Sequence, residues 1–238
     1  MKAAKLMSGM AMMAMSVAVL AAPSITVQWD SPIVNPSLGS VSVTSPVGNP
    51  TANVGRFTGQ VTAFSGIDAA ELVLSTDDFF AYCHDLAQTI TGGNTYQYTD
   101  VTFGSTEKVQ DFLGAVNVYL KGDAFAWLKP LNKEQSGAIQ LGIWEGLYGD
   151  DFNIDTGNVR FGGSKLTEPL RTIFDDIVSG MAGSADLDSK YVMVLKHPNS
   201  QDVITGYRPP RLQVPEPGTL ALLGVATLVA GIARRRRS

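Results

Sequence analysis

The chain has 238 residues, of which 45% are hydrophobic, 18 are basic and 22 are acidic. Six of the basic residues lie in the first 21 residues or in a terminal arginine cluster, and one acid lies beyond residue 213, so the segment between holds 12 basic and 21 acidic residues. This negative charge argues against nucleic acid and anionic lipid as partners of that segment. Its length, about 190 residues, allows one domain with a substantial hydrophobic core.

The first 21 residues have the order of parts of a secretory signal. Met1–Lys5 is short and basic, Leu6–Leu20 is apolar, and Val19 and Ala21 are the aliphatic and small residues expected before a signal-peptidase cut. We therefore expect a signal peptidase to cleave after Ala21, and we expect export of an ectodomain that spans residues 22–206.

The ectodomain begins with segments that favour β-structure. Valine, threonine and aromatic residues alternate with period two between turn residues, as they do in half-buried strands. Strands are expected at 25–29, at 41–44, at 56–64, in part of 72–83 and at 95–98. Prolines at positions 32, 36, 46 and 50 are expected to break up the first two strands.

The periodicity changes to that of helices after residue 104. Apolar residues recur at helical spacing from Val109 to Leu120, after a capping pattern that begins at Ser105. Further helices are expected over 132–149 and 166–181, and a β-hairpin over 191–207. The sequence thus predicts an α+β fold, a β-sandwich- or barrel-like framework with about three inserted helices. A proline-rich linker at 207–214 follows the ectodomain.

Cys83 is the single cysteine of a chain that is expected to reach an oxidising compartment. It has no internal disulfide partner, and an unpaired thiol in an exported protein requires an explanation. Three explanations are open. Cys83 is a buried and inert thiol that behaves as a small hydrophobic group, it forms an intermolecular disulfide, or it is committed to a chemical reaction.

Two short segments favour the third explanation. The first, Tyr82-Cys83-His84-Asp85, lies where an expected strand ends, and the second, Gln140-Leu141-Gly142-Ile143-Trp144, lies on the second expected helix. Their order and spacing resemble the thioester domains of bacterial surface adhesins, over residues 65–205. The resemblance implies that Cys83 supplies the sulfur and Gln140 the acyl carbon of an internal thioester. It also implies that this bond is surrounded by Tyr82, His84, Asp85, Ile143 and Trp144.

A thioester of this kind would capture a partner once, without turnover. The thiol displaces ammonia from the carboxamide, and the activated acyl group survives only where water is excluded. An amine-bearing ligand then opens the bond, with His84 or Asp85 available to assist proton transfer. On this interpretation the protein is not an enzyme and needs neither a metal nor another cofactor.

Two other chemistries have weaker support in the sequence. A cysteine hydrolase needs a base beside Cys83, but His84 is its neighbour on a strand and should face the opposite side. The remaining histidine, His197, lies in an expected turn. The acidic segment 149–155 offers oxygen ligands for Ca²⁺ but lacks the glycine and the glutamate of an EF-hand loop, so we expect a solvated turn.

The tail, residues 215–238, combines a turn, an apolar run and a cationic end. Pro215, Glu216 and Pro217 prevent the following helix from extending backwards. The run from Thr219 to Ala233 would reach about 24 Å at 1.5 Å per residue, which is marginal against a hydrocarbon core of about 30 Å. A cluster of four arginines should hold the end on the cytoplasmic side: Arg234, Arg235, Arg236 and Arg237.

This order of parts resembles the PEP-CTERM sorting signal of exported bacterial proteins. The resemblance implies processing by an exosortase-type sorting enzyme after transient anchoring in the inner membrane, and an ordinary tail anchor is the alternative. We therefore expect a protein of the cell surface or extracellular matrix. Its ectodomain would be an adhesin-like binder of an amine-bearing ligand or an extracellular polysaccharide. The alternative is a non-covalent structural component of the matrix in which Cys83 is inert.

Overall fold

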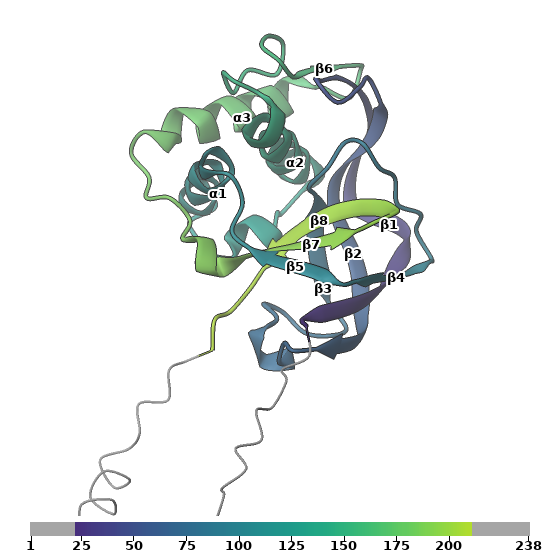
Figure 1. The fold of residues 1–238 in the computed structure, drawn as a ribbon. Coiled ribbons are helices and arrows are strands. Elements are labelled where there is room, and N and C mark those ends of the chain that lie inside the picture. Colours follow the sequence, from purple (N-terminus) through teal and green to yellow (C-terminus); the bar gives the residue numbers. More distant parts are fainter. Residues whose placement is uncertain (1–21, 211–238) are drawn as a thin grey trace, which may run out of the picture.

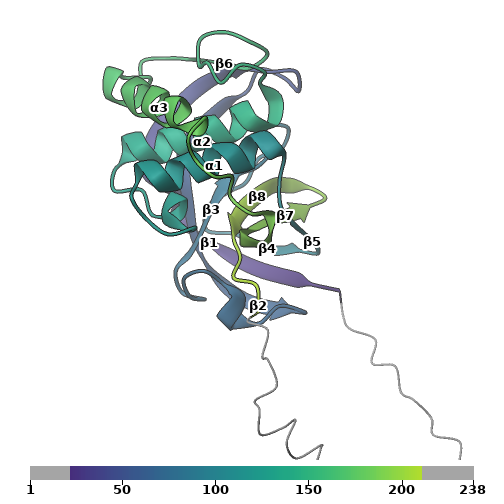
Figure 2. The same cartoon turned by 90° about the vertical axis from the view of Figure 1, so that its left-hand side faces the viewer.

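A computed structural model describes residues 22–210, and the predicted signal segment and sorting tail lie outside this range. The described chain forms a strongly curved, nearly closed sheet of eight strands with three α-helices packed to one side of it (Figures 1 and 2). The predicted α+β class with a barrel-like framework is therefore confirmed. Among the described residues, no helix combines the length and the apolar character needed to cross a membrane.

All strand pairs of the sheet are antiparallel. The order along the sheet is β4-β1-β2-β3-β8-β7-β5, and β6 pairs with the far part of β1. The two end strands of this order, β4 and β5, are separated in sequence by Thr99 alone, which draws the edges of the sheet together. The strands are β1 (Ser24–Thr44), β2 (Thr51–Ser65), β3 (Phe79–Cys83), β4 (Thr95–Tyr98), β5 (Asp100–Phe103), β6 (Arg160–Gly162), β7 (Val192–His197) and β8 (Ser200–Gly206).

The long strand β1 corrects the expectation that Pro32 and Pro36 separate two short strands. β1 continues through both prolines while its pairing register with β2 shifts between Trp29 and Val34 and again before Gly39. Such irregularities leave residues unpaired and bend the strand, so prolines are tolerated there. β3 is also shorter than the expected segment, because residues 72–78 make no strand and β3 begins at Phe79.

Three helices follow the predicted segments closely: α1 (Glu107–Tyr119), α2 (Lys133–Tyr148) and α3 (Glu168–Met181). The N-cap of α1 is Thr106 rather than Ser105, and its hydroxyl accepts a hydrogen bond from the Val109 N–H at 3.3 Å. The side chain of Asn132 caps α2 in the same way, and Gly149 ends that helix. These caps satisfy backbone N–H groups that have no partner within the helix.

Helix α2 is the central element of the fold, because it packs against β1, β2 and both other helices. Every residue from Ser136 to Gly146 is buried, including the polar Gln140 and Glu145. The close approach of α1 depends on Gly142, since a Cβ at that position would overlap the ring of Phe112. The fold thus carries the polar side chain of Gln140 into the interior beside the sheet.

Candidate functional site

The site lies where the end of β3 meets the middle of α2. Cys83 is the last residue of β3 and pairs with Val203 of β8, while Gln140 lies near the centre of the helix. Both residues are buried, with 1% and 0% of their surfaces exposed. The fold therefore brings together the two segments that the sequence singles out, which lie 57 positions apart.

Two hydrogen bonds join Gln140 to the main chain of Cys83. The Cys83 N–H donates to Gln140 Oε1 at 2.9 Å, and Gln140 Nε2 donates to the Cys83 carbonyl at 2.9 Å. The carboxamide is thereby fixed in the plane of these two bonds, beside the residue that carries the thiol. A buried glutamine is expected to be paired in this way, because an unpaired amide in the interior costs free energy.

The thiol of Cys83 is buried and hydrogen-bonded to the main chain, near the carboxylate of Asp85. Its Sγ donates to the Asp85 carbonyl at 2.6 Å, and the same carbonyl accepts from Gln201 Nε2 at 3.1 Å. Burial raises the pKa of the Cys83 thiol, and this effect outweighs the indole of Trp144 and the amide of Gln201, which lower it. At neutral pH the sulfur is therefore a protonated thiol.

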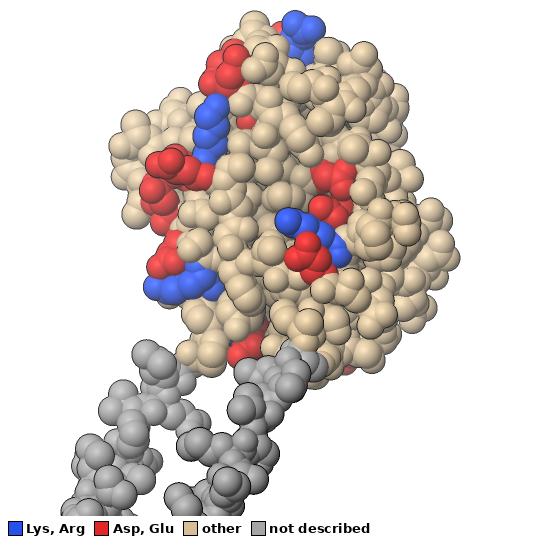
Figure 3. Space-filling model, in the orientation of Figure 1, with Lys and Arg blue, Asp and Glu red and all other residues tan. Residues whose placement is uncertain are grey.

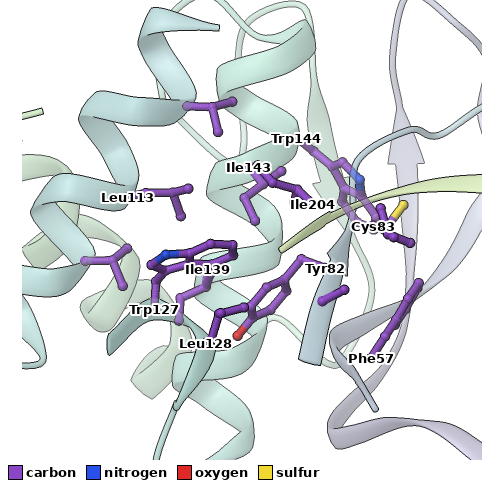
Figure 4. Close-up of a cluster of buried hydrophobic side chains, with 14 of the residues drawn as sticks. Phe57, Tyr82, Cys83, Leu113, Trp127, Leu128, Ile139, Ile143, Trp144 and Ile204 are labelled. Carbon is purple, nitrogen blue, oxygen red and sulfur yellow. The ribbon is translucent and has the colours of Figure 1, made fainter. Parts of the chain in front are cut away.

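Aromatic and aliphatic side chains surround the pair and exclude water. Trp144 lies beside Cys83 in Figure 4, and its indole N–H has no hydrogen-bond partner of ordinary length among the described residues. Tyr82 is buried and stacks on Trp127 with ring centroids 5.9 Å apart. Ile143 is also completely buried, one helical turn from Ile139 in the same cluster (Figure 4). This surrounding is dry, as a persistent thioester requires.

The other two predicted neighbours, His84 and Asp85, do not present their side chains to the sulfur. The His84 ring nitrogen Nε2 is 3.1 Å from the Ser105 hydroxyl, and burial lowers the pKa of His84 to about 4. The Asp85 carboxylate organises the following turn, because it accepts from the backbone N–H groups of Ala87, Gln88 and Asp202. Asp85 accepts from the thiol through its backbone carbonyl, and the charge of its carboxylate adds to the rise in the pKa of the thiol.

The second histidine, His197, also lies away from the thiol chemistry. Its ring packs edge-on against Tyr96 and Tyr98, and its Nδ1 accepts a hydrogen bond from the Asn199 N–H at 3.1 Å. The structure therefore joins neither histidine to Cys83 as a cysteine hydrolase would need.

The acidic turn after α2 uses its oxygens within the turn and in an ion pair with α3. Asp150 accepts from the Asn158 N–H, and Asp151 accepts from the Asn153 N–H and the Thr156 hydroxyl. Asp155 forms an ion pair with Arg171. The described part of the chain brings no three histidine, cysteine or acidic side chains into an arrangement that could hold a metal ion.

Gln201 is the site residue that the sequence analysis missed. It lies on β8, and the hairpin with β7 places its amide against the Asp85 carbonyl. A polar residue in an alternating strand gives no indication of this contact.

Comparison with known proteins gives one match, which covers the C-terminal tail. The PEP-CTERM protein-sorting motif matches residues 213–237. The chain carries a PEP-CTERM tail. No curated protein and no solved structure shows significant similarity to the chain.

The PEP-CTERM tail confirms the prediction made from the Pro-Glu-Pro turn, the apolar run and the arginine cluster. It marks an exported protein that is transiently anchored at the membrane, processed by an exosortase and sorted to the cell surface. The face of the ectodomain in Figure 3 is mostly uncharged, and its acidic and basic side chains are interspersed. The resemblance of the ectodomain to thioester domains stays a prediction.

Proposed function

We propose that the sorted ectodomain captures amines covalently through a thioester between Cys83 and Gln140. The observation that supports this proposal is the pair of 2.9 Å hydrogen bonds that hold the Gln140 carboxamide against Cys83 in a buried, dry site. A glutamine with a structural role alone could pair with any main-chain groups, whereas this one pairs with the only cysteine of the chain.

The geometry supplies a donor for bond formation. As Cys83 Sγ attacks the Gln140 amide carbon, negative charge develops on Oε1, and the Cys83 N–H already donates to that oxygen. The C–S bond forms, the C–N bond breaks, and the thiol proton leaves with the nitrogen as ammonia. A primary amine later attacks the same carbon, the C–S bond breaks, and the sulfur regains a proton while an amide remains on residue 140.

Methylamine incorporation tests this function. Wild-type ectodomain should gain one methylamide at Gln140, whereas Cys83→Ser and Gln140→Asn should gain none while keeping their circular dichroism spectra. Gln97→Asn is the matched control, because Gln97 is exposed on β4. Folded wild-type protein that gains no adduct, and that shows an unmodified glutamine by peptide mapping, would overturn the proposal.

One observation favours a second function, that of a non-covalent structural component of the matrix. Cys83 is completely enclosed, and its thiol is neutral and donates to the Asp85 carbonyl. These are the properties of an inert core cysteine. On this account, Cys83→Ala retains every binding property of the wild type in a matrix-association assay, whereas the thioester account predicts loss of attachment to amine-bearing surfaces.

A further inference from the structure

A cavity of about 170 Å³ lies directly outside the Cys83–Gln140 site. Its inner wall includes the buried side chains of Phe57, Leu86 and Trp144, and its rim carries the exposed residues Thr51 and Asn53. Figure 4 shows one of these wall residues, Trp144, beside Cys83. The cavity is therefore open at its rim and ends at the residues that enclose the sulfur.

Two cavity residues also face the thiol itself. The side chains of Trp144 and Gln201 both line the cavity and both lie against Cys83 Sγ, where they lower the pKa that burial raises. Gln201 further donates to the Asp85 carbonyl, the acceptor of the thiol. A ligand in the cavity is thus separated from the reacting atoms by a single layer of side chains.

The chemistry of the wall restricts the ligand. No lining residue is acidic, basic or histidine, and most of the inner surface is aliphatic or aromatic. The polar side chains of the lining are those of Thr51, Asn53, Gln88, Thr89 and Gln201, and all of them are neutral. Hydroxyl and amide oxygens of this kind can accept a hydrogen bond from a ligand N–H.

We propose that this cavity admits an unbranched aliphatic primary amine toward the thioester, with its aliphatic and aromatic wall enclosing the chain and the side chains of Trp144 and Gln201 separating it from the reacting atoms. The inference rests on the proposed function for its covalent step, although the cavity and its specificity are tested separately below. The volume is below the about 300–1,000 Å³ of pockets for drug-sized ligands, so a short chain fits and a bulky one does not.

The uncharged wall also selects the reactive form of the amine. Transfer of an ammonium group into an apolar site is costly, so burial lowers the pKa of the amine and favours its neutral, nucleophilic form. A second charge at the far end of a short chain would be placed in the same apolar wall. The cavity should therefore prefer n-butylamine to 1,4-diaminobutane and to 4-aminobutyrate, which share its four-carbon chain.

Ala52→Phe tests the proposal by filling the cavity, because Ala52 lies on β2 and contributes to the lining. Ala63→Phe is the matched control on the same strand, at an exposed position outside the cavity. The intact mass of each protein first shows whether the thioester is present. This result tests the proposed function separately from the test of the cavity. Thermal unfolding establishes that both variants fold.

If the thioester is present, the rate of n-butylamine incorporation should saturate with concentration and fall about tenfold or more in Ala52→Phe. Ala63→Phe should match the wild type, and the two charged amines should react about tenfold more slowly than n-butylamine. If the thioester is absent, n-butylamine should instead shift the Trp144 indole N–H resonance of the wild type and Ala63→Phe saturably, and leave Ala52→Phe unchanged. Equal rates or equal shifts in Ala52→Phe and the wild type, or no preference among the three amines, would overturn the proposal.

Discussion

The contribution of Gln140 to the stability of the ectodomain can be worked out from its two hydrogen bonds. Gln140→Met conserves most of the side-chain volume but leaves the N–H and the carbonyl of Cys83 buried without partners. Each such group costs about 1–3 kcal/mol, so a total loss of roughly 2–6 kcal/mol is expected. This is a large part of the about 5–15 kcal/mol that separates folded from unfolded domains.

The measurement is urea unfolding in a Cys83→Ser background, where no thioester can contribute. With a slope of about 2–3 kcal/mol per molar urea, the midpoint of Cys83→Ser/Gln140→Met should fall by roughly 1–3 M relative to Cys83→Ser. Gln97→Met, at an exposed position of β4, should leave the midpoint unchanged in the same background. If the double variant unfolds at the same urea concentration as Cys83→Ser, the amide pairing does not hold α2 against β3 and our reasoning about the site is refuted.

Three further predictions concern the core and the tail. Burial, with a smaller contribution from Asp151 and Asp150, raises the pKa of Glu145 to about 8; stability should therefore fall by about 2 kcal/mol as the pH rises from about 5 to about 7. In urea unfolding, Glu145→Gln should lack this fall in stability with rising pH. If stability depends on pH in the same way in Glu145→Gln and in the wild type, this prediction is wrong. Gly142→Ala should lower the melting temperature, because the new methyl group overlaps the ring of Phe112. Gly180→Ala should not lower it, because no atom lies within 4 Å of the added Cβ. Equal melting temperatures of the two variants would contradict this prediction and show that α1 can move away from α2. Replacing Pro215-Glu216-Pro217 of the sorting motif by alanines should allow export but block tail processing, seen as full-length protein on immunoblots of envelope fractions; normal processing would contradict it.

Local signals explain why the helices could be predicted from the sequence. Asn132 and Gly149 are residue types that favour helix ends, and they bound α2 in the structure. The strand β6 was missed because its three residues become a strand only by pairing with Ser42, Val43 and Thr44 of β1. This pairing spans more than a hundred positions of the chain and leaves no local pattern in residues 160–162.

The candidate site was predictable only in its central pair. Two short motifs indicated Cys83 and Gln140, and the structure places them in direct contact. The form of that contact, through the main chain of Cys83, could not be predicted, because it depends on how deeply α2 packs against the end of β3. The same holds for the contact of Gln201 and for the cavity, because β1, β2, β8, α2 and the residues after β3 come together there.

The intact mass of the processed wild-type ectodomain tests the central claim most directly. Thioester formation expels one ammonia, so the wild type should be lighter than its sequence by the mass of ammonia, while Cys83→Ser and Gln140→Asn should have their full sequence masses. Denaturation in the presence of hydroxylamine should then open the bond and label residue 140. A folded wild type with its full sequence mass would contradict the thioester and leave Cys83 as a buried thiol of a non-covalent matrix component.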